Sequence, residues 1–322
     1  MPTDSDISWP VLRRIVQEWA GSSAELAEVK PLDGGCISTT LALNLTNHDK
    51  AVLKISAHRV DRSYQREAHQ LELLRKAGVP APAVYVWKIG TLDDPFSYLL
   101  MEFIEGVDWA EARRVATAEQ FEGLQVHLAE VVRALHATTR GSYGRVEAEV
   151  VAGRDGERRE AGCEEFEEWP KFYHHIYDQI CQNMEKSPLV PVKGRKLIHK
   201  VRDKLDRLIA HEDCPRLLHW DLWASNILAA CDDQGRYRVA ALLDPHAKFG
   251  HAEAELAYLV FFQTVGPAFM KAYQREGKLS EEYHRVRKPV YQLHSLLNHT
   301  HLFGEKYAKR LGAALERVGG LV

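Results

Sequence analysis

The sequence of 322 residues contains no long apolar run and no excess of charge of one sign. Its longest apolar segment, Leu256–Phe262, is much shorter than the roughly 20 residues that a membrane-spanning helix needs. There are 42 lysine and arginine residues and 45 acidic residues, giving a formal charge of −3. This balance does not indicate a surface for nucleic acid or anionic lipid, so we expect no nucleic-acid partner and no membrane partner.

Cysteine is also scarce, and its pattern excludes two common uses of the residue. The five cysteines are odd in number and scattered, without a CxxC pair, which argues against a disulfide framework and against a zinc site. The first six residues are polar and acidic, unlike a secretory signal. We therefore expect reduced thiols and a cytoplasmic location. The cysteines are Cys36, Cys163, Cys181, Cys214 and Cys231.

The order of apolar patterns predicts an α+β fold with two lobes. A β-rich first third, interrupted by a helix over 62–77 and preceded by a helix over 9–20, is followed by mainly helical periodicity after Gly106. The pattern places a small lobe at residues 1–104, a larger helical lobe at 105–322, and a hinge near 102–107. The expected strands cover residues 41–45, 51–55, 83–87 and 97–103.

The most informative stretch is His219-Trp220-Asp221-Leu222-Trp223-Ala224-Ser225-Asn226, followed later by Asp244. Two apolar runs between Asn226 and Asp244 flank a turn signal over 232–236, which predicts a hairpin centred at Gly235, midway between the two residues. The two strand ends would bring an amide oxygen beside a carboxylate, a donor pair that suits Mg²⁺. Asp221 is then placed to accept a proton from an attacking hydroxyl, as in phosphoryl transfer.

Residues earlier in the sequence are of the types that bind the phosphates of a nucleotide. Gly34, Gly35 and Cys36 form a turn whose backbone N–H groups suit phosphate. Lys54 lies inside a strand, and Glu67 lies on the apolar face of the next helix. A carboxylate on such a face is costly unless it is paired, so we expect a Lys54–Glu67 ion pair of the kind that kinases use.

The last strand of the β-rich third offers a place for adenine. Met101 would line the back of the pocket, and Glu102 and Ile104 would contribute main-chain contacts. The glycine turn, lysine, glutamate, hinge, His-x-Asp-x₄-Asn and second aspartate occur in the order found in kinases. This order predicts an ATP-dependent enzyme with Mg²⁺ as its metal.

The arrangement resembles the protein-kinase-like small-molecule kinases, which include aminoglycoside and choline kinases, and most closely the fructosamine/ketosamine-3-kinase family. The resemblance implies a bilobal protein-kinase-like fold and phosphorylation by ATP of a sugar hydroxyl on free or protein-bound ketosamines, a deglycation repair. It implies that Asp221 is the catalytic base, that Asn226 and Asp244 hold Mg²⁺, and that Trp223 forms a wall of the sugar site. The stretches that carry it are residues 35–38, 221–226, 250–257, 291–299 and 303–307.

The sequence departs from the family pattern at three places. Trp220 replaces the usual glycine of the His-x-Asp triplet, His246 replaces a small residue, and a charged loop over 153–168 is unusually long. Because Trp220 and His246 border the acceptor site, a kinase of another hydroxylated amine, such as an aminosugar or aminoglycoside, is the alternative. A nucleotide-binding pseudokinase is disfavoured, since a binding module needs no base such as Asp221.

Overall fold

The computed structural model describes residues 7–32, 39–57, 61–146 and 165–322, which belong to two compact units. The lobe boundary expected after residue 104 stays a prediction. Asn226 and Asp244 belong to the first unit, and Asp221 belongs to the second. The first unit comprises Met1–Leu124, Val146–Ala161 and Ala224–His246, and the second comprises Gln125–Arg145, Gly162–Trp223 and Ala247–Val322.

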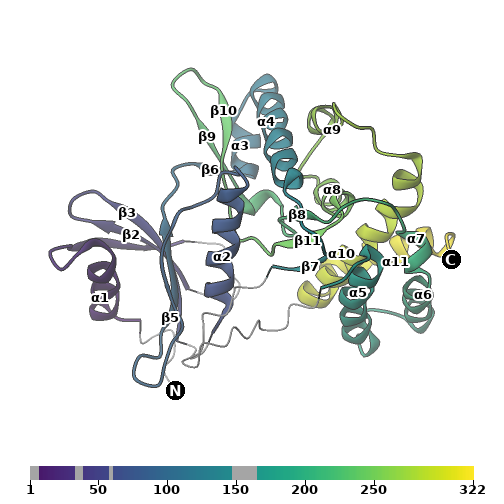
Figure 1. The fold of residues 1–322 in the computed structure, drawn as a ribbon, viewed down its shortest axis with the longest axis horizontal. Helices are drawn as coiled ribbons and strands as arrows, with labels where there is room; N and C mark the ends of the chain where they lie inside the picture. The colour runs from purple at the N-terminus through teal and green to yellow at the C-terminus, as the bar shows by residue number, and fades with distance from the viewer. Residues whose placement is uncertain (1–6, 33–38, 58–60, 147–164) are drawn as a thin grey trace. The chain divides into compact units, whose positions relative to one another are not determined.

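A five-stranded antiparallel sheet dominates the first unit (Figure 1). Alternating apolar residues of its strands, such as Leu43 and Leu53, are fully buried and pack with Ile15 of helix α1 (Trp9–Ala20). The four strands predicted from the sequence are confirmed, with ends that differ by one or two residues. In spatial order the strands are β1 (Leu26–Pro31), β2 (Thr39–Leu45), β3 (Lys50–Ser56), β5 (Ser97–Glu102) and β4 (Val84–Lys88).

Helix α2 (Ser63–Lys76) packs against β4 and β5 (Figure 1). Its buried face contains Ala68, Leu71 and Leu74, each without solvent exposure. Glu67 precedes this face by one residue, so the helix carries a carboxylate to the edge of the core. The helix predicted over 62–77 is confirmed.

The predicted hairpin is also present in the first unit. Strand β9 (Ile227–Cys231) pairs antiparallel with β10 (Tyr237–Leu242), and β6 (Val107–Asp108) extends the sheet beside β9. Gly235 adopts a φ of +74° at the turn, a conformation that glycine reaches without steric cost. The hairpin begins after the short helix η2 (Ala224–Asn226), and helix α3 (Trp109–Val115) follows β6.

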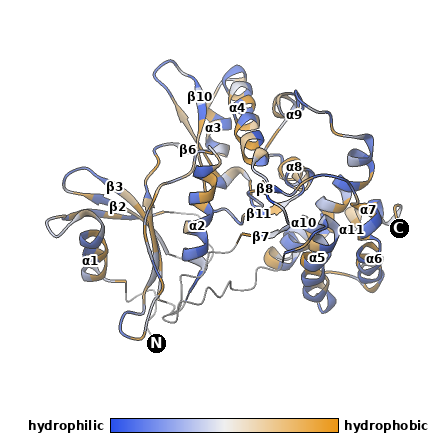
Figure 2. Ribbon diagram, in the orientation of Figure 1, coloured by the Kyte–Doolittle hydropathy of each residue, from blue (hydrophilic) through white to orange (hydrophobic). Residues whose placement is uncertain are grey.

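The second unit is mainly helical, with amphipathic helices that show apolar and polar residues along their length (Figure 2). Within the described ranges, no helix is both long and apolar enough to cross a lipid bilayer. Helix α4 (Ala118–Ala137) begins in the first unit and continues in this one, and its leucines from Leu124 to Leu135 are buried. The other helices are α5 (Trp169–Glu185), α6 (Val192–Arg202), α7 (Leu205–Leu208), α8 (Ala252–Phe261), α9 (Pro267–Tyr273), η3 (Tyr283–Arg287), α10 (Lys288–Phe303) and α11 (Glu305–Gly319).

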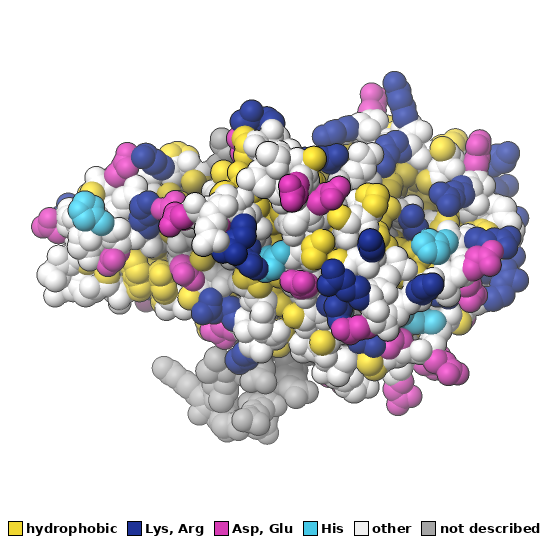
Figure 3. Space-filling model, turned by 90° about the horizontal axis from the view of Figure 1, so that it is seen from above, with side chains coloured by type: hydrophobic (Ala, Val, Ile, Leu, Met, Phe, Trp, Pro, Cys, Tyr) yellow, Lys and Arg dark blue, Asp and Glu magenta, His cyan; other side chains and the backbone are white. Residues whose placement is uncertain are grey.

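A small antiparallel sheet of the second unit leads into residues 219–226, the stretch that is predicted to carry the base. Its strands are β7 (Gly144–Arg145), β11 (Lys248–Gly250) and β8 (Arg216–Leu218), in that spatial order. Strand β8 ends one residue before His219, and β11 ends two residues before helix α8. On the surface, acidic and basic side chains are interspersed with apolar ones (Figure 3), as the nearly balanced composition indicates.

Candidate active site

Lys54 joins three elements of the first unit. Its Nζ lies 2.7 Å from Glu67 Oε1 on helix α2, and it also forms an ion pair with Asp244, which follows β10. Lys54 is 9 % exposed, so its ammonium depends on these carboxylates rather than on bulk water. The ion pair with Glu67 that the sequence predicts is present, and the lysine is fixed in one orientation by two acids.

The residues expected to hold a metal lie at neighbouring ends of the hairpin. The N–H of Leu243 donates to the carbonyl oxygen of Asn226 at 2.9 Å, so Asn226 and Asp244 stand beside this bond. Asn226 is 7 % exposed, and Asp244 has a left-handed φ of +52°. A carboxylate and an amide supply the hard oxygen donors that Mg²⁺ prefers, so these residues fit the ion. Their role as metal ligands stays a prediction.

The hinge residues follow the end of the five-stranded sheet. Met101 is buried in β5, and the Glu102 N–H donates to Ala83 O at 2.8 Å while its carboxylate accepts from Ala83 N at 3.0 Å. Glu102 could therefore offer only its carbonyl oxygen to an adenine edge. Ile104 is half-buried in the segment after β5. Gly34, Gly35 and Cys36 lie outside the described residues, and so does the glycine turn predicted there.

Asp221 makes a short contact inside the second unit. The Tyr258 hydroxyl on helix α8 donates to Asp221 Oδ1 at 2.6 Å. Burial raises the pKa of the Tyr258 phenol, and the neighbouring Asp221 carboxylate raises it further, so the phenol stays protonated and donates. This bond holds the Asp221 carboxylate through Oδ1, and the role of Asp221 as the base for an acceptor hydroxyl stays a prediction. Sequence reasoning missed Tyr258.

Replacing Tyr258 by phenylalanine should lower kcat about tenfold and leave the KM for ATP unchanged. The reason is that a hydrogen bond to a charged group contributes about 1.5–3 kcal/mol, and the Asp221 carboxylate would lose the contact that fixes its orientation. Initial rates at varied ATP, with circular dichroism to establish folding, would measure this. A kcat equal to that of the wild type would remove Tyr258 from this positioning role.

Trp220, the residue between His219 and Asp221, has an unusual backbone conformation. Its φ is +70°, a region that costs a non-glycine residue about 1–2 kcal/mol and that glycine adopts readily. The Trp220 N–H donates to Glu255 Oε1 at 2.7 Å, and Glu255 Oε2 lies 2.9 Å from His136 Nε2. Lys248 Nζ lies 4.6 Å from the centre of the Trp220 ring. These contacts hold the strained residue directly before Asp221.

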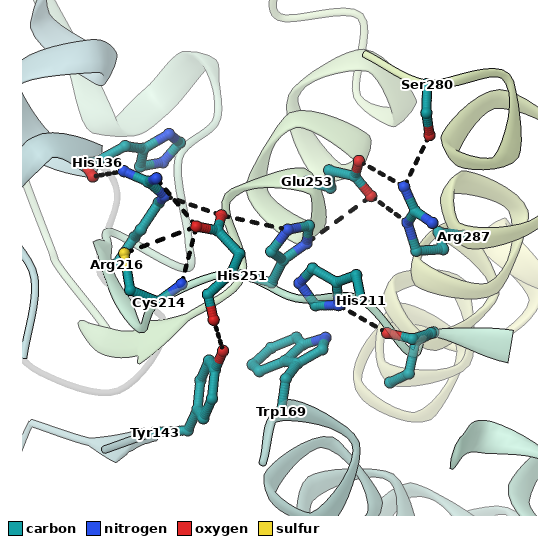
Figure 4. A network of polar contacts seen from close by, with 12 residues as sticks. His136, Tyr143, Trp169, His211, Cys214, Arg216, His251, Glu253, Ser280 and Arg287 are labelled. Carbon is teal, nitrogen blue, oxygen red and sulfur yellow. Dashed lines mark hydrogen bonds and ion pairs between the residues drawn. The ribbon is translucent and has the colours of Figure 1, made fainter. Parts of the chain in front are cut away.

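A buried polar network lies at the start of helix α8 (Figure 4). Arg287 on η3 donates to both carboxylate oxygens of Glu253, at 2.5 and 2.9 Å. His251 is 5 % exposed and lies 3.6 Å from Asp213 Oδ2. Burial, with the neighbouring His211 and arginine side chains, holds the pKa of His251 well below its usual value. These groups brace the start of helix α8, the helix that carries Glu255 and Tyr258.

His294 on α10 is packed among aromatic rings close to Trp220. Its ring centre lies 5.3 Å from that of Tyr173 and 6.1 Å from that of Trp220. Burial, reinforced by the charge of Lys248, lowers the pKa of His294 to about 3. The imidazole is therefore neutral in the folded protein at neutral pH.

The free energy of unfolding should fall as the pH drops below about 6.5. The unfolded chain takes up a proton at His294 below that pH, whereas the folded chain does so only near pH 3, so acid favours unfolding. The loss from this residue is about 2 kcal/mol at pH 5. Urea unfolding at pH 7.5 and pH 5.0 would measure it, and His294→Phe should lose less stability between the two pH values. An equal loss in variant and wild type would contradict the assignment.

The two other substrate candidates have exposed side chains. Trp223 is 40 % exposed and belongs to the second unit, while His246 is exposed and belongs to the first. Their contact with a substrate stays a prediction. Most of the charged loop expected over 153–168 lies outside the described residues, and α5 begins directly after it at Trp169.

The fold is that of the protein-kinase-like phosphotransferases, enzymes that phosphorylate a hydroxyl group. A crystal structure of a Thermobifida fusca protein assigned as a fructosamine-3-kinase matches with a TM-score of 0.75, at 24% identity over 97% of this chain and 99% of that one. The aminoglycoside phosphotransferase APH(4)-Ia, bound to AMP-PNP and hygromycin B, matches with a TM-score of 0.67 at 17% identity, over 95% and 98% of the two chains.

Sequence comparison identifies the family. The family model for fructosamine kinase matches residues 8–319, so the chain belongs to the fructosamine kinase family. An Escherichia coli protein named as a probable ketoamine kinase is 26% identical over 317 residues, covering 96% of this chain and 99% of its own. The chloroplastic protein-ribulosamine 3-kinase of Oryza sativa subsp. indica is 25% identical over 317 residues, covering 92% and 80%.

Proposed function

We propose that this protein is an ATP-dependent kinase that transfers the γ-phosphoryl group to a sugar hydroxyl of a ketosamine. Membership in the fructosamine kinase family supports this reaction. The observation that carries the proposal is the position of Lys54, whose ammonium pairs with Glu67 and Asp244. In kinases the same ion pair between a strand lysine and a helix glutamate directs the lysine to the nucleotide phosphates.

The residues divide the reaction between them. Lys54 orients the phosphates of ATP, and Asn226 and Asp244 would hold Mg²⁺, which neutralises phosphate charge when it is bound. Asp221 accepts the proton of the acceptor hydroxyl. The hydroxyl oxygen forms the new bond to the γ-phosphorus as the bond from that phosphorus to the bridging oxygen breaks, and ADP leaves with the bond electrons. Tyr258 holds the Asp221 carboxylate in place.

The names of similar proteins support the acceptor class, and the free thiols support the setting. Similar proteins are named ketoamine kinases and protein-ribulosamine 3-kinases, which supports free or protein-bound ketosamines as substrates. The exposed ring of Trp223 suits the C–H face of a sugar. Breakdown of the phosphorylated adduct would release the amine and complete a deglycation repair. The described cysteines Cys181, Cys214 and Cys231 are free thiols, which favours a cytoplasmic setting.

A second candidate is a kinase of aminosugars or aminoglycosides. The likeness of fold to APH(4)-Ia and the bulky Trp220 next to Asp221 favour it. It would use the same base and the same metal ligands, and differ only in the acceptor. A pseudokinase remains unsupported, because a nucleotide-binding module does not require Asp221 and the phenol that orients it.

A coupled assay of ATP consumption with Mg²⁺ tests the proposal. Fructosyl and ribulosyl adducts of one amine should be phosphorylated with a kcat/KM well above that for kanamycin or hygromycin B. Faster turnover of the aminoglycosides would support the second candidate instead. No acceptor-dependent ATP consumption with either class would overturn both.

A further inference from the structure

Five aromatic side chains of the second unit form a continuous cluster beside Asp221. Ring centres lie 4.6 Å apart for Phe262 and His299, 5.5 Å for His299 and Phe303, and 5.2 Å for His299 and Tyr307. Tyr258 joins the cluster through Phe262, at 4.6 Å. We call this set of rings, Tyr258, Phe262, His299, Phe303 and Tyr307, the aromatic platform.

Tyr258 connects the platform to the reacting atoms. Its ring packs on Phe262, and its hydroxyl donates to Asp221 at 2.6 Å. An acceptor hydroxyl must approach the Asp221 carboxylate to within about 3 Å. The remainder of the acceptor molecule then extends over a few ångströms, a distance that includes the rings next to Tyr258. The platform is thus close to a bound acceptor.

The platform presents uncharged rings. His299 Nδ1 lies 2.9 Å from Ser295 O and donates its proton there, and burial lowers the pKa of His299, so its imidazole is neutral. Phe303 is 49 % exposed, a large apolar area for a residue in contact with two other rings. Exposed aromatic faces of this kind bind apolar and aromatic groups, because stacking removes apolar surface from water.

We propose that the aromatic platform binds the amine-side group of the ketosamine, and that it favours acceptors in which this group is apolar or aromatic. The inference rests on the proposed function, since it places the sugar hydroxyl at Asp221. It also gives a role to the segment 299–307, which contributes no group to phosphoryl transfer itself. Polar, polycationic aminoglycosides offer no comparable apolar surface to these rings.

Two acceptors with the same sugar test the proposal. They are the methylamine adduct and the phenethylamine adduct of one sugar. The sugar is whichever of fructosyl and ribulosyl gives the higher kcat/KM in the coupled assay. Both carry one secondary ammonium group, so they differ only in the apolar aromatic part. We expect the wild-type kcat/KM to be roughly tenfold higher for the phenethylamine adduct, as the burial of a few carbon atoms produces in enzyme pockets.

Variants of adjacent residues on α10 locate the effect. Phe303→Ala should reduce the ratio of the two kcat/KM values to about one, mainly through the KM of the phenethylamine adduct. Leu302→Ala, which removes a neighbouring side chain that is 59 % exposed and outside the platform, should keep the wild-type ratio. Melting temperatures of both variants should stay close to that of the wild type, because both side chains are exposed.

The outcomes separate the two proposals. The platform proposal would be wrong if the wild type turned over both adducts with equal kcat/KM. It would also be wrong if Phe303→Ala and Leu302→Ala had the same ratio of the two kcat/KM values. Either result would leave the proposed ketosamine kinase activity unaffected. Absence of turnover with either adduct would overturn the proposed function and the platform together.

Discussion

Replacing Asp221 by asparagine should lower kcat by a factor of about 10²–10⁴ and leave ATP binding intact. The amide has nearly the size of the carboxylate and still accepts the hydrogen bond from Tyr258, but it cannot take a proton from the acceptor hydroxyl. Lys54, which we propose orients the phosphates, and the predicted metal ligands belong to the other unit and are unchanged by the substitution. Steady-state rates with saturating ATP and a fluorescent-nucleotide binding assay would separate the two effects.

Asp206→Asn is a matched control for this experiment. Asp206 lies in the same unit on helix α7, and it is exposed. The control should show wild-type rates, because the same loss of one negative charge occurs away from the reacting atoms. A kcat of Asp221→Asn within threefold of the wild type would show that another group takes the proton.

Two parts of the site could be predicted from the sequence because local patterns define them. The hairpin between Asn226 and Asp244 follows from two apolar runs around a turn with glycine, and its pairing fixes which strand ends meet. The Lys54–Glu67 ion pair follows from a carboxylate at the edge of an apolar helix face, which needs a partner. In both cases a rule about neighbouring residues was sufficient.

The bond between Tyr258 and Asp221 could not be predicted in that way. The residues are separated by 37 positions, and only the packing of helix α8 against the segment that contains Asp221 brings them together. A buried partner for Glu255, by contrast, could have been predicted by the rule that applies to Glu67. It is a carboxylate among apolar residues of one helix, 2 % exposed, and its partners are Trp220 and His136.

The structural effect of Trp220 could not be predicted from the sequence, because it depends on the backbone conformation of this residue. The resemblance to the family leads us to expect glycine at this position, and the bulky tryptophan predicts a change in the acceptor site. The φ of +70° shows that Trp220 adopts a left-handed conformation that glycine would adopt readily. For tryptophan this conformation is sterically strained. The ring packs with Trp169 and His294, and the strain is offset by contacts that also order the residue before Asp221.

Replacing Asp244 by alanine should raise the Kd for ATP at least about tenfold in the presence of Mg²⁺, since even indirect partners of a bound metal commonly change its affinity by that factor. With EDTA the variant should bind ATP no more weakly than the wild type, because Lys54 keeps Glu67 and loses a competing carboxylate. Isothermal titration with and without Mg²⁺ measures both. Asp233→Ala, an exposed position at the opposite end of the same hairpin, should match the wild type in both titrations. Equal weakening of Asp244→Ala with and without Mg²⁺ would assign Asp244 to holding Lys54 rather than the metal.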